Sequence, residues 1–438
     1  MRLTLPIKSM VITSVSPAES FSRPVEHPGQ FWIGTYAARW SVFGRRQHIA
    51  SQTETHWRLA QLKEAWAMNC EVEFLAVGDA SRAGDCIVVR YGEVDNYKLM
   101  VVDGGTAATG EALVAHLKRQ FGSNVRIEHV VLTHSDVDHA SGLRELFKEI
   151  PVENLWMHIP WLLAEEAIHL FKNKKWTKDG LTKAVKDEYD ILSEILDLAW
   201  ATDCKVYYPF QGSAIGPFTV LSPKRATYLH LLPQFEKTPE PDQDALEAAG
   251  IWIGKAAPSG LSNLLTALTE TVQKWIPESW TNERLKDGGS TSASNESSVV
   301  LYADIGNNQR LLLTGDAGIN ALQWAKNYAT KQGFVLQQFS FVQIPHHGSR
   351  RNVGPSILNE LIGPIQPDGT QTWTAFVSAP ADDAKHPRSI VLNAFTRRGA
   401  RVAATQGTSK VHWGGFPPRS GYIAAEVIAL RTTVEDYD

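Results

Sequence analysis

The chain has 438 residues, of which 43% are hydrophobic and 21% are charged, an ordinary composition for a folded protein with a large core. The formal net charge of -4 and the pI of about 6.4 exclude a protein that binds nucleic acid through an overall basic charge. Three isolated cysteines and the lack of any run of 18 apolar residues argue against a disulfide framework, a cysteine zinc site and a membrane span. The composition therefore predicts a cytoplasmic protein without a membrane anchor.

The first 67 residues differ from the rest of the chain. They show no sustained hydrophobic period apart from one helical pattern at 54–66. We interpret residues 1–67 as an N-terminal extension, either an accessory arm or a disordered segment. Regular strand patterns begin at Met68, so we expect one α/β domain from 68 to 438.

Short apolar runs and helical patterns alternate in the first half of this domain. Helical spacing predicts helices at 111–121 and 141–150, with Ser141 as the N-cap of the second. β-rich runs closed by Gly or Asp predict strands at 72–78, 85–92, 98–105 and 126–134.

Two stretches interrupt the strand pattern, and we interpret them as insertions at about 155–201 and 224–294. The first is helical over roughly 161–201, and the second contains a helical pattern at 261–276. Strand patterns resume at 297–306, 309–316, 339–349, 372–379 and 400–406. Two groups of strands with helices between and around them predict an α/β sandwich.

The segment THSDVDHASG (133–142) directly follows an apolar run and contains four potential metal ligands: His134, Asp136, Asp138 and His139. A solvent-exposed turn that caps the next helix is the alternative, but such a turn needs only one Asp or Ser. Other polar residues also follow strand patterns: Asp103, Asp316, His346, His347 and His386. Strand ends at one edge of a packed sheet can bring such residues together.

Imidazole and carboxylate groups together suit divalent zinc, manganese or iron. Two such ions lower the pKa of bound water towards neutrality and stabilise negative charge on attacked and leaving groups. The pattern therefore favours a hydrolytic site with two metal ions.

The motifs together resemble the metallo-β-lactamase superfamily, and more closely the hydrolase domain of ComEC-type DNA-uptake proteins. The resemblance covers roughly Glu71 to Gln406 and rests on GDCIVV, VVDGG, LTHSDVDHASG, NESSVVL, LLLTGD, IPHHGS and KHP in this order. It implies a four-layer αββα sandwich with helical insertions. Because this chain lacks a membrane channel, a separate role in nucleic-acid turnover or in defence against foreign DNA fits better than DNA uptake.

The resemblance also implies a role for each residue. His134 and Asp136 would serve one metal ion, and Asp138 and His139 the other. Asp136 stands where the superfamily usually has a second histidine, a departure that the ComEC branch shares. Asp316 matches the aspartate that bridges the ions, and His346 or His347 completes the ligands of the second ion. Asp103 matches an aspartate that orients the ligands without binding metal itself.

One histidine of the superfamily pattern, between the main loop and the bridging aspartate, has no match here. Asn295 stands in that interval, and we expect it to support the ligands rather than to replace the histidine. The first metal site is therefore expected to be the weaker one. An aspartate-rich site also shifts metal preference from zinc towards manganese.

The expected catalytic residues are Asp138, which also binds metal, and His386, as a proton donor or a phosphate contact. The alternative for His386 is a turn histidine before Pro387. Arg350 and Arg351, which follow HHGS, are candidates for contacts with a substrate phosphate because arginine binds phosphate in a bidentate manner.

The resemblance favours a phosphodiesterase or nuclease that acts through metal-bound hydroxide on a nucleic-acid substrate. One alternative is the hydrolysis of a small-molecule ester, lactone, amide or thioester on the same fold. Another is a binding module with a degenerate site, which the missing histidine supports and the otherwise complete set of ligands opposes.

Overall fold

The computed structural model describes residues 68–78, 83–254, 274–383 and 385–437. The predicted N-terminal extension, including the helix at 54–66, lies outside these residues. Most of the predicted helix at 261–276 does too. The prediction for the end of this helix was wrong, because Trp275–Pro277 form strand β9, which pairs with β16 (Thr433–Glu435). Tertiary pairing with a distant strand overrides the local helical pattern there.

The first of two seven-stranded sheets has the order β15-β1-β2-β3-β4-β5-β6. β1 to β3 are antiparallel, and β3 to β6 are parallel. Its strands are β1 (Asn69–Phe74), β2 (Cys86–Gly92), β3 (Tyr97–Gly104), β4 (Ile127–Val131), β5 (Val152–Trp156), β6 (Lys205–Tyr207) and β15 (Lys410–His412).

The second sheet has the order β14-β13-β12-β11-β10-β8-β7. Here β11 to β14 are parallel, whereas β10 runs antiparallel to both of its neighbours. Its strands are β7 (Ala214–Ile215), β8 (Phe218–Ser222), β10 (Val300–Asp304), β11 (Arg310–Leu313), β12 (Phe341–Gln343), β13 (Trp373–Val377) and β14 (Ala400–Ala404).

The two sheets face each other across an apolar core. Phe74 of β1 lies edge-on to Phe341 and Phe376 of the second sheet, with ring centroids 5.7 Å away in both cases. These residues are fully or almost fully buried, as expected where side chains from two inner sheet faces interdigitate.

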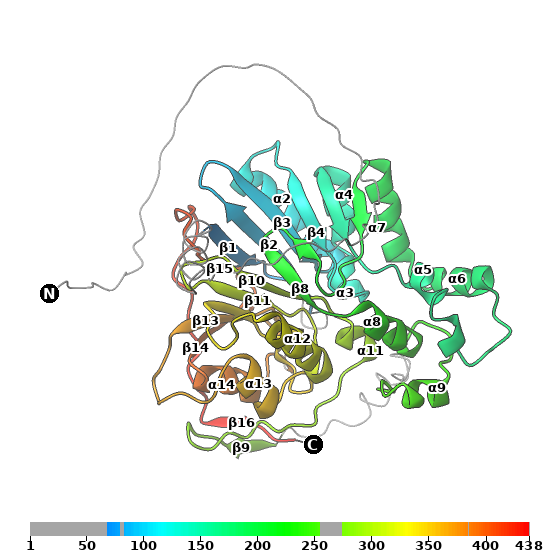
Figure 1. Ribbon diagram of the computed structural model, residues 1–438. Helices are drawn as coiled ribbons and strands as arrows, with labels where there is room; N and C mark the ends of the chain where they lie inside the picture. The colour runs from blue at the N-terminus through cyan, green and yellow to red at the C-terminus, as the bar shows by residue number, and fades with distance from the viewer. Residues whose placement is uncertain (1–67, 79–82, 255–273, 384, 438) are drawn as a thin grey trace, which may run out of the picture.

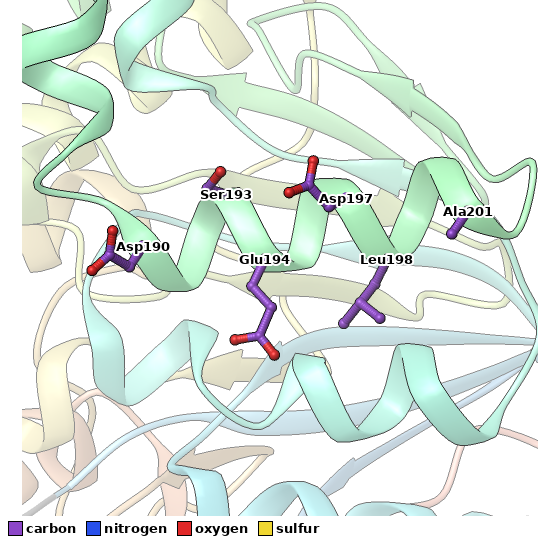
Figure 2. Close-up of a pocket in the computed structure, with 6 residues that line it drawn as sticks. All are labelled: Asp190, Ser193, Glu194, Asp197, Leu198 and Ala201. Carbon is purple, nitrogen blue, oxygen red and sulfur yellow. The ribbon is translucent and has the colours of Figure 1, made fainter.

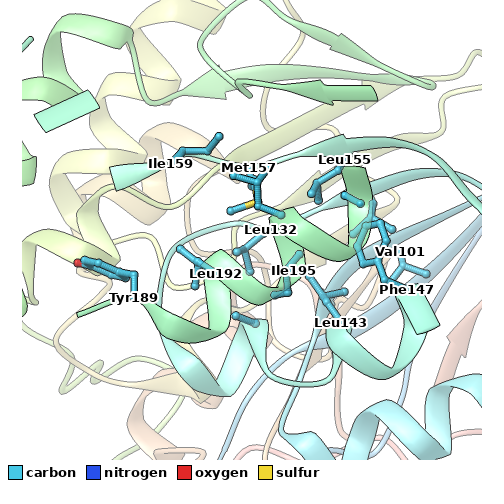
Figure 3. Close-up of a cluster of buried hydrophobic side chains, with 14 of the residues drawn as sticks. Val101, Leu132, Leu143, Phe147, Leu155, Met157, Ile159, Tyr189, Leu192 and Ile195 are labelled. Carbon is cyan, nitrogen blue, oxygen red and sulfur yellow. The ribbon is translucent and has the colours of Figure 1, made fainter. Parts of the chain in front are cut away.

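Helices cover both outer faces, which completes the four predicted layers (Figure 1). The first sheet carries α2 (Ala107–Phe121), α4 (Leu143–Glu149) and α7 (Asp190–Ala201), and the second α12 (Ile319–Gln332), α13 (Pro355–Leu361) and α14 (Ser389–Arg397). Figure 3 shows the core under α4 and α7, where both helices bury leucine, isoleucine and phenylalanine side chains against the sheet. The predicted αββα sandwich is confirmed.

The two predicted insertions hold additional short elements. The connection from β5 to β6 begins after Trp156 and contains α5 (Pro160–Ala164), η1 (Ile168–Leu170), α6 (Lys178–Lys186) and α7. The later stretch contains α8 (Arg225–Leu231), η2 (Leu232–Gln234), α9 (Gln243–Ala248), β9 and α11 (Ala293–Glu296). Within the described part of the chain, no helix has the length and hydropathy needed to cross a membrane.

The predicted helix cap at Ser141 was wrong. Ser141 ends α3 (Val137–Ala140), where its hydroxyl donates to the Val137 carbonyl, and α4 starts after Gly142. At α12 the cap position belongs to Gly318, and the carboxylate of Glu296 accepts from the Ala321 amide at 2.7 Å. The carboxylate of Asp316, two residues before Gly318, lies in the histidine cluster described next.

Candidate metal centre

The polar motifs of both sheets meet at the carboxyl ends of the parallel strands. Asp103 ends β3, the His134–His139 loop follows β4, and Asp316 follows β11. The backbone joins the two sheets at this edge, because the Val299 amide donates to the Thr133 carbonyl at 3.0 Å. The predicted convergence of strand ends is therefore present in the structure.

Four imidazole rings surround one carboxylate oxygen. The Nε2 atoms lie 3.4 Å (His139), 3.6 Å (His346), 3.9 Å (His134) and 3.9 Å (His347) from Asp316 Oδ2. Asp316 therefore lies at the centre of the histidine cluster; the bridging role that the resemblance implies for it stays a prediction.

Hydrogen bonds orient the two histidines of the β4 loop. His139 Nδ1 donates to Asp103 Oδ2 at 2.7 Å. The Thr133 hydroxyl donates to the same oxygen at 2.6 Å, so its lone pair accepts from His134 Nδ1 at 3.0 Å. These hydrogen bonds fix the orientation of both rings and turn each Nε2 towards Asp316, where it can bind a cation once it carries no proton.

The histidines after β12 are anchored in the same way. His347 Nδ1 donates to the Ser378 carbonyl at 3.1 Å. The side-chain amide of Asn352 donates to the Asp316 carbonyl at 2.8 Å, which directs its Oδ1 to accept from His346 Nδ1 at 2.9 Å. All four Nε2 atoms are consequently available as ligands.

Several of these buried atoms lack any hydrogen bond. Among the described residues, Nε2 of His134, His139 and His347 and Oδ1 of Asp316 have no partner. An unpaired buried polar atom costs about 1–3 kcal/mol. Three unpaired Nε2 atoms that converge on one carboxylate, whose Oδ1 is itself unpaired, fit a set of metal ligands. Three groups of residues here have ligand atoms within 4.8 Å of one another: His134–His139–Asp316, Asp138–His139–His347 and Asp316–His346–His347.

The electrostatics of the cluster also fit a cation. Burial raises the pKa of Asp316, but His139, His346 and His347 outweigh burial and hold that pKa well below its usual range. Burial lowers the pKa of His139, but Asp316 and Asp103 together raise it well above the usual range. Metal binding must displace the His139 proton, so we expect metal affinity to fall at acidic pH.

Asp136 and Asp138, the two other carboxylates of the loop, face different neighbours. Asp136 Oδ2 lies 3.5 Å from His134 Nε2, and its Oδ1 accepts from the Ser294 hydroxyl at 2.6 Å. Asp138 groups with His139 and His347. Asn295 lies at the edge of the cluster, where its amide donates to Thr291 Oγ1 at 2.8 Å and lies 3.1 Å from His346 Nδ1.

The sequence did not single out Ser294, Asn352 or Thr133, all of which hold ligands. A hydroxyl or amide beside a motif is too common for sequence to separate it from turn residues. Asp85 also lies beside the cluster: its carboxylate accepts from Gln343 Nε2 at 2.7 Å and is close to Asp103 and His139. Burial raises the pKa of Asp85 to about 7.

His386 lies beside the cluster. Its ring stacks on that of His346 at 6.4 Å between centroids, and its Nδ1 donates to Asp383 Oδ2 at 3.1 Å. Burial lowers the pKa of His386 to about 4, so the ring is neutral at pH 7. A neutral ring with its proton on Nδ1 has its lone pair on Nε2 and can donate from that atom only after taking up a proton. The predicted role of His386 as a proton donor or phosphate contact stays a prediction.

The two arginines after HHGS have different surroundings. Arg350 donates to the Asp436 carbonyl and lies 4.7 Å from the Tyr437 ring centroid. Arg351 is exposed. The C-terminal residues thus hold Arg350, which leaves Arg351 as the more accessible candidate for a phosphate contact.

A separate open hollow of about 440 Å³ runs along the outer side of α7 (Figure 2). Its lining residues are Asp190, Ser193, Glu194, Asp197, Leu198 and Ala201. None of them is a candidate ligand, so this hollow is distinct from the histidine cluster.

Comparisons with known proteins agree with this architecture. A family model described as the Metallo-beta-lactamase superfamily matches residues 74–198, which include Asp103 and the β4 loop. No curated protein sequence matches the chain.

Solved structures similar to this chain include two that it covers almost completely. The metallo-beta-lactamase fold protein YhfI from Bacillus subtilis is 11% identical, with 79% of this chain and 100% of that chain covered and a TM-score of 0.35. Unliganded yeast PDE1 is 12% identical, with 78% and 99% covered and a TM-score of 0.37. The paired sheets, the helical layers and the matched segment together show that this protein has the metallo-β-lactamase fold.

Proposed function

We propose that the protein is a metal-dependent phosphodiesterase that uses two divalent ions, zinc or manganese, and acts on nucleic acid. The observation that carries the metal site is the arrangement of four histidines whose Nδ1 atoms are anchored and whose Nε2 atoms converge on Asp316. Ligands oriented in advance in this way bind metal without further ordering of side chains.

The preference for a phosphodiester rests on the loop His134–His139. Asp136 replaces the usual histidine, as in the ComEC-like branch. Three carboxylates (Asp136, Asp138 and Asp316) give the site oxygen ligands that also suit manganese. When bound, the ions would lower the pKa of a coordinated water molecule and offset the charge that develops on phosphorus oxygens.

The protein's own residues would orient the metal ligands and carry protons in this reaction. Asp103 and Thr133 hold His139 and His134, and Asn352 holds His346. The neutral His386, with Nδ1 bonded to Asp383, has Nε2 free to take up a proton; only after gaining one can it protonate a leaving oxygen. Arg351 is placed after the ligand loop, where an extended substrate could contact it.

We further propose a cytoplasmic location. Cys70, Cys86 and Cys204 are all buried free thiols, which suits a reducing compartment.

The test is a substrate panel with defined metal content. Metal-depleted protein would be reloaded with Zn²⁺ or Mn²⁺ and offered single- and double-stranded DNA, RNA, bis-p-nitrophenyl phosphate and nitrocefin. We expect hydrolysis of phosphodiesters and its loss in the double variant Asp138→Ala/His139→Ala. His169→Ala, which removes an exposed histidine on η1, is the matched control and should keep full activity.

Other outcomes would reject the proposal. Hydrolysis of nitrocefin without any phosphodiester would assign the small-molecule alternative. Protein that binds no metal and is no more active than the double variant would exclude both enzymes and leave a binding module.

A further inference from the structure

Three cationic side chains lie on two loops that border the metal centre. Arg350 and Arg351 follow the two histidines after β12, and Lys286 lies on the loop between β9 and α11. Arg351 and Lys286 are exposed, and in the described part of the chain neither forms an ion pair with a carboxylate. Their charges are therefore accessible to an anion from outside the protein.

The two loops are packed against each other. A Cβ atom at Gly289 would lie 2.6 Å from the Arg351 carbonyl oxygen, so only glycine lets the two backbones approach this closely. The neighbouring Asp287 is directed at α13, where its carboxylate accepts from the amide and the hydroxyl of Ser356 at 3.1 Å and 2.7 Å. The loop that carries Lys286 is thus fixed beside Arg351.

Tyr437, from the C-terminal segment, holds two of the cations. Its ring centroid lies 4.6 Å from Lys286 Nζ and 4.7 Å from Arg350 Cζ, distances at which the face of an aromatic ring attracts a cation. Its hydroxyl accepts from the Lys286 amide at 2.8 Å, and the Asp436 carbonyl accepts from Arg350. Tyr437 therefore offsets the repulsion between two like charges and keeps them together.

Both loops lead to the metal ligands. Asn352, the residue after Arg351, accepts from His346 Nδ1 at 2.9 Å. On the other loop, Thr291 Oγ1 accepts from Asn295 at 2.8 Å, and the Asn295 amide lies 3.1 Å from the same His346 atom. Cations thus follow the histidine cluster along two loops that are joined to each other.

We propose that Lys286 and Arg351 bind the backbone phosphates of a single strand of nucleic acid, on one side of the bond that is cleaved. Tyr437 is a positioning residue that holds Lys286. A strand carries further phosphates for these cations, whereas a small diester has only the phosphate at the metal centre. A single strand is favoured because the central ligands are buried and a stiff duplex bends into such a site only at a cost.

This inference rests on the proposed function for its substrate, but binding tests it without any activity. Metal-depleted full-length protein would be titrated with a fluorescein-labelled oligothymidylate, and fluorescence anisotropy would give the affinity at several salt concentrations. We expect Lys286→Met and Arg351→Met each to weaken binding about 10-fold at low salt. The slope of log affinity against log salt should become shallower by about 0.7 in each.

Two further variants serve as controls for these. Arg351→Lys keeps the positive charge and should keep the salt slope of the wild type. Lys331→Met removes an exposed lysine in the last turn of α12, about 20 Å along the helix from the β11 strand end. It should bind the oligothymidylate like the wild type.

Tyr437 should act through Lys286 and not on the strand itself. Tyr437→Leu should weaken binding, whereas Tyr437→Phe keeps the ring and should retain most of the affinity. The loss in Tyr437→Leu/Lys286→Met should be smaller than the sum of the two single losses, because both changes remove the same contact. Thermal melting would verify that each variant is folded.

The metal-loaded protein gives a second measurement. In Lys286→Met and Arg351→Met, the ratio of kcat/KM for the oligothymidylate to kcat/KM for bis-p-nitrophenyl phosphate should fall about 10-fold. The change should lie mainly in a higher KM for the oligothymidylate, because these cations would bind the strand before and during the reaction alike.

Three results would overturn the inference: a wild type that does not bind the oligothymidylate, unchanged affinity in Lys286→Met and Arg351→Met, or an equal loss in Lys331→Met. Tighter binding of a duplex than of the single strand would overturn the assignment to a single strand. If the oligothymidylate binds as expected but no phosphodiester is cleaved, only the proposed activity fails.

Discussion

The clusters around Arg398 and Asp316 are both buried and charged, but their polar atoms have different partners. Arg398 donates from Nε to Asn359 at 3.0 Å and from Nη1 to Glu283 at 2.7 Å, and its Nη2 reaches both of these side chains. Around Asp316, four Nε2 atoms approach one carboxylate oxygen at 3.4–3.9 Å, and three of them have no hydrogen bond among the described residues.

This difference separates a structural cluster from a ligand site. The donors of Arg398 and the acceptors around it satisfy one another, so the cluster is complete without any other group. The four histidines around Asp316 use their Nδ1 atoms for hydrogen bonds that orient the rings. Three of them leave Nε2 without a hydrogen bond among the described residues. Burial of charge alone therefore does not indicate function, whereas converging unpaired atoms do.

Removing the carboxylate at the centre should have the largest effect. We expect Asp316→Asn to lower phosphodiester hydrolysis by at least about 10³-fold and to reduce bound metal, because the shared anionic ligand is lost. Metal analysis and initial rates would measure this. Asp304→Asn, which removes an exposed carboxylate paired with Arg310, should change neither; an Asp316→Asn variant with full metal content would show that the cluster is structural.

Breaking the Arg398 cluster should affect stability instead. Arg398→Met leaves the Glu283 carboxylate and the Asn359 amide without their shared donor, and we expect the free energy of unfolding to fall by about 3–5 kcal/mol. Urea unfolding would measure the loss, and metal per folded chain should stay unchanged. The matched control is Arg401→Met, which replaces an exposed arginine and should change the free energy of unfolding little. An equal loss of stability in both variants would contradict the structural role of the Arg398 cluster.

His158 sharpens the comparison, because its unpaired nitrogens face aromatic rings instead of ligands. Neither ring nitrogen has a partner in the described residues, and Tyr228 and Phe210 lie 4.2 Å and 4.8 Å away between ring centroids. Burial, aided by Arg225, lowers the pKa of His158 to about 3. We therefore expect no effect of His158→Phe on bound metal.

The same residue should make stability depend on pH. Below pH 6.5 the unfolded chain binds a proton at His158 that the folded protein does not accept until about pH 3. The stabilisation present above pH 6.5 is therefore lost as pH falls, by about 2 kcal/mol at pH 5. Urea unfolding at pH 7.5 and pH 5 should show a smaller decrease for His158→Phe than for the wild type; equal decreases would mean that His158 is not the group responsible.

The sequence by itself determined the layers and most of the cluster. Apolar runs of strand length specify buried strands, and polar residues directly after them must lie at the strand ends. This local rule placed Asp103, His134, Asp316 and the histidine pair at one edge, and the structure brings them together there.

Only the tertiary structure decided how these residues are held in place. Ser294 and Asp136 are 158 positions apart, and the contacts of His346 with Asn295 and of Arg350 with Tyr437 also join separate segments. Such contacts depend on how the two sheets and the C-terminal segment pack, which no local pattern encodes. The different directions of the His346 and His347 side chains likewise go with backbone φ angles of 46° and 53°, which no local pattern encodes.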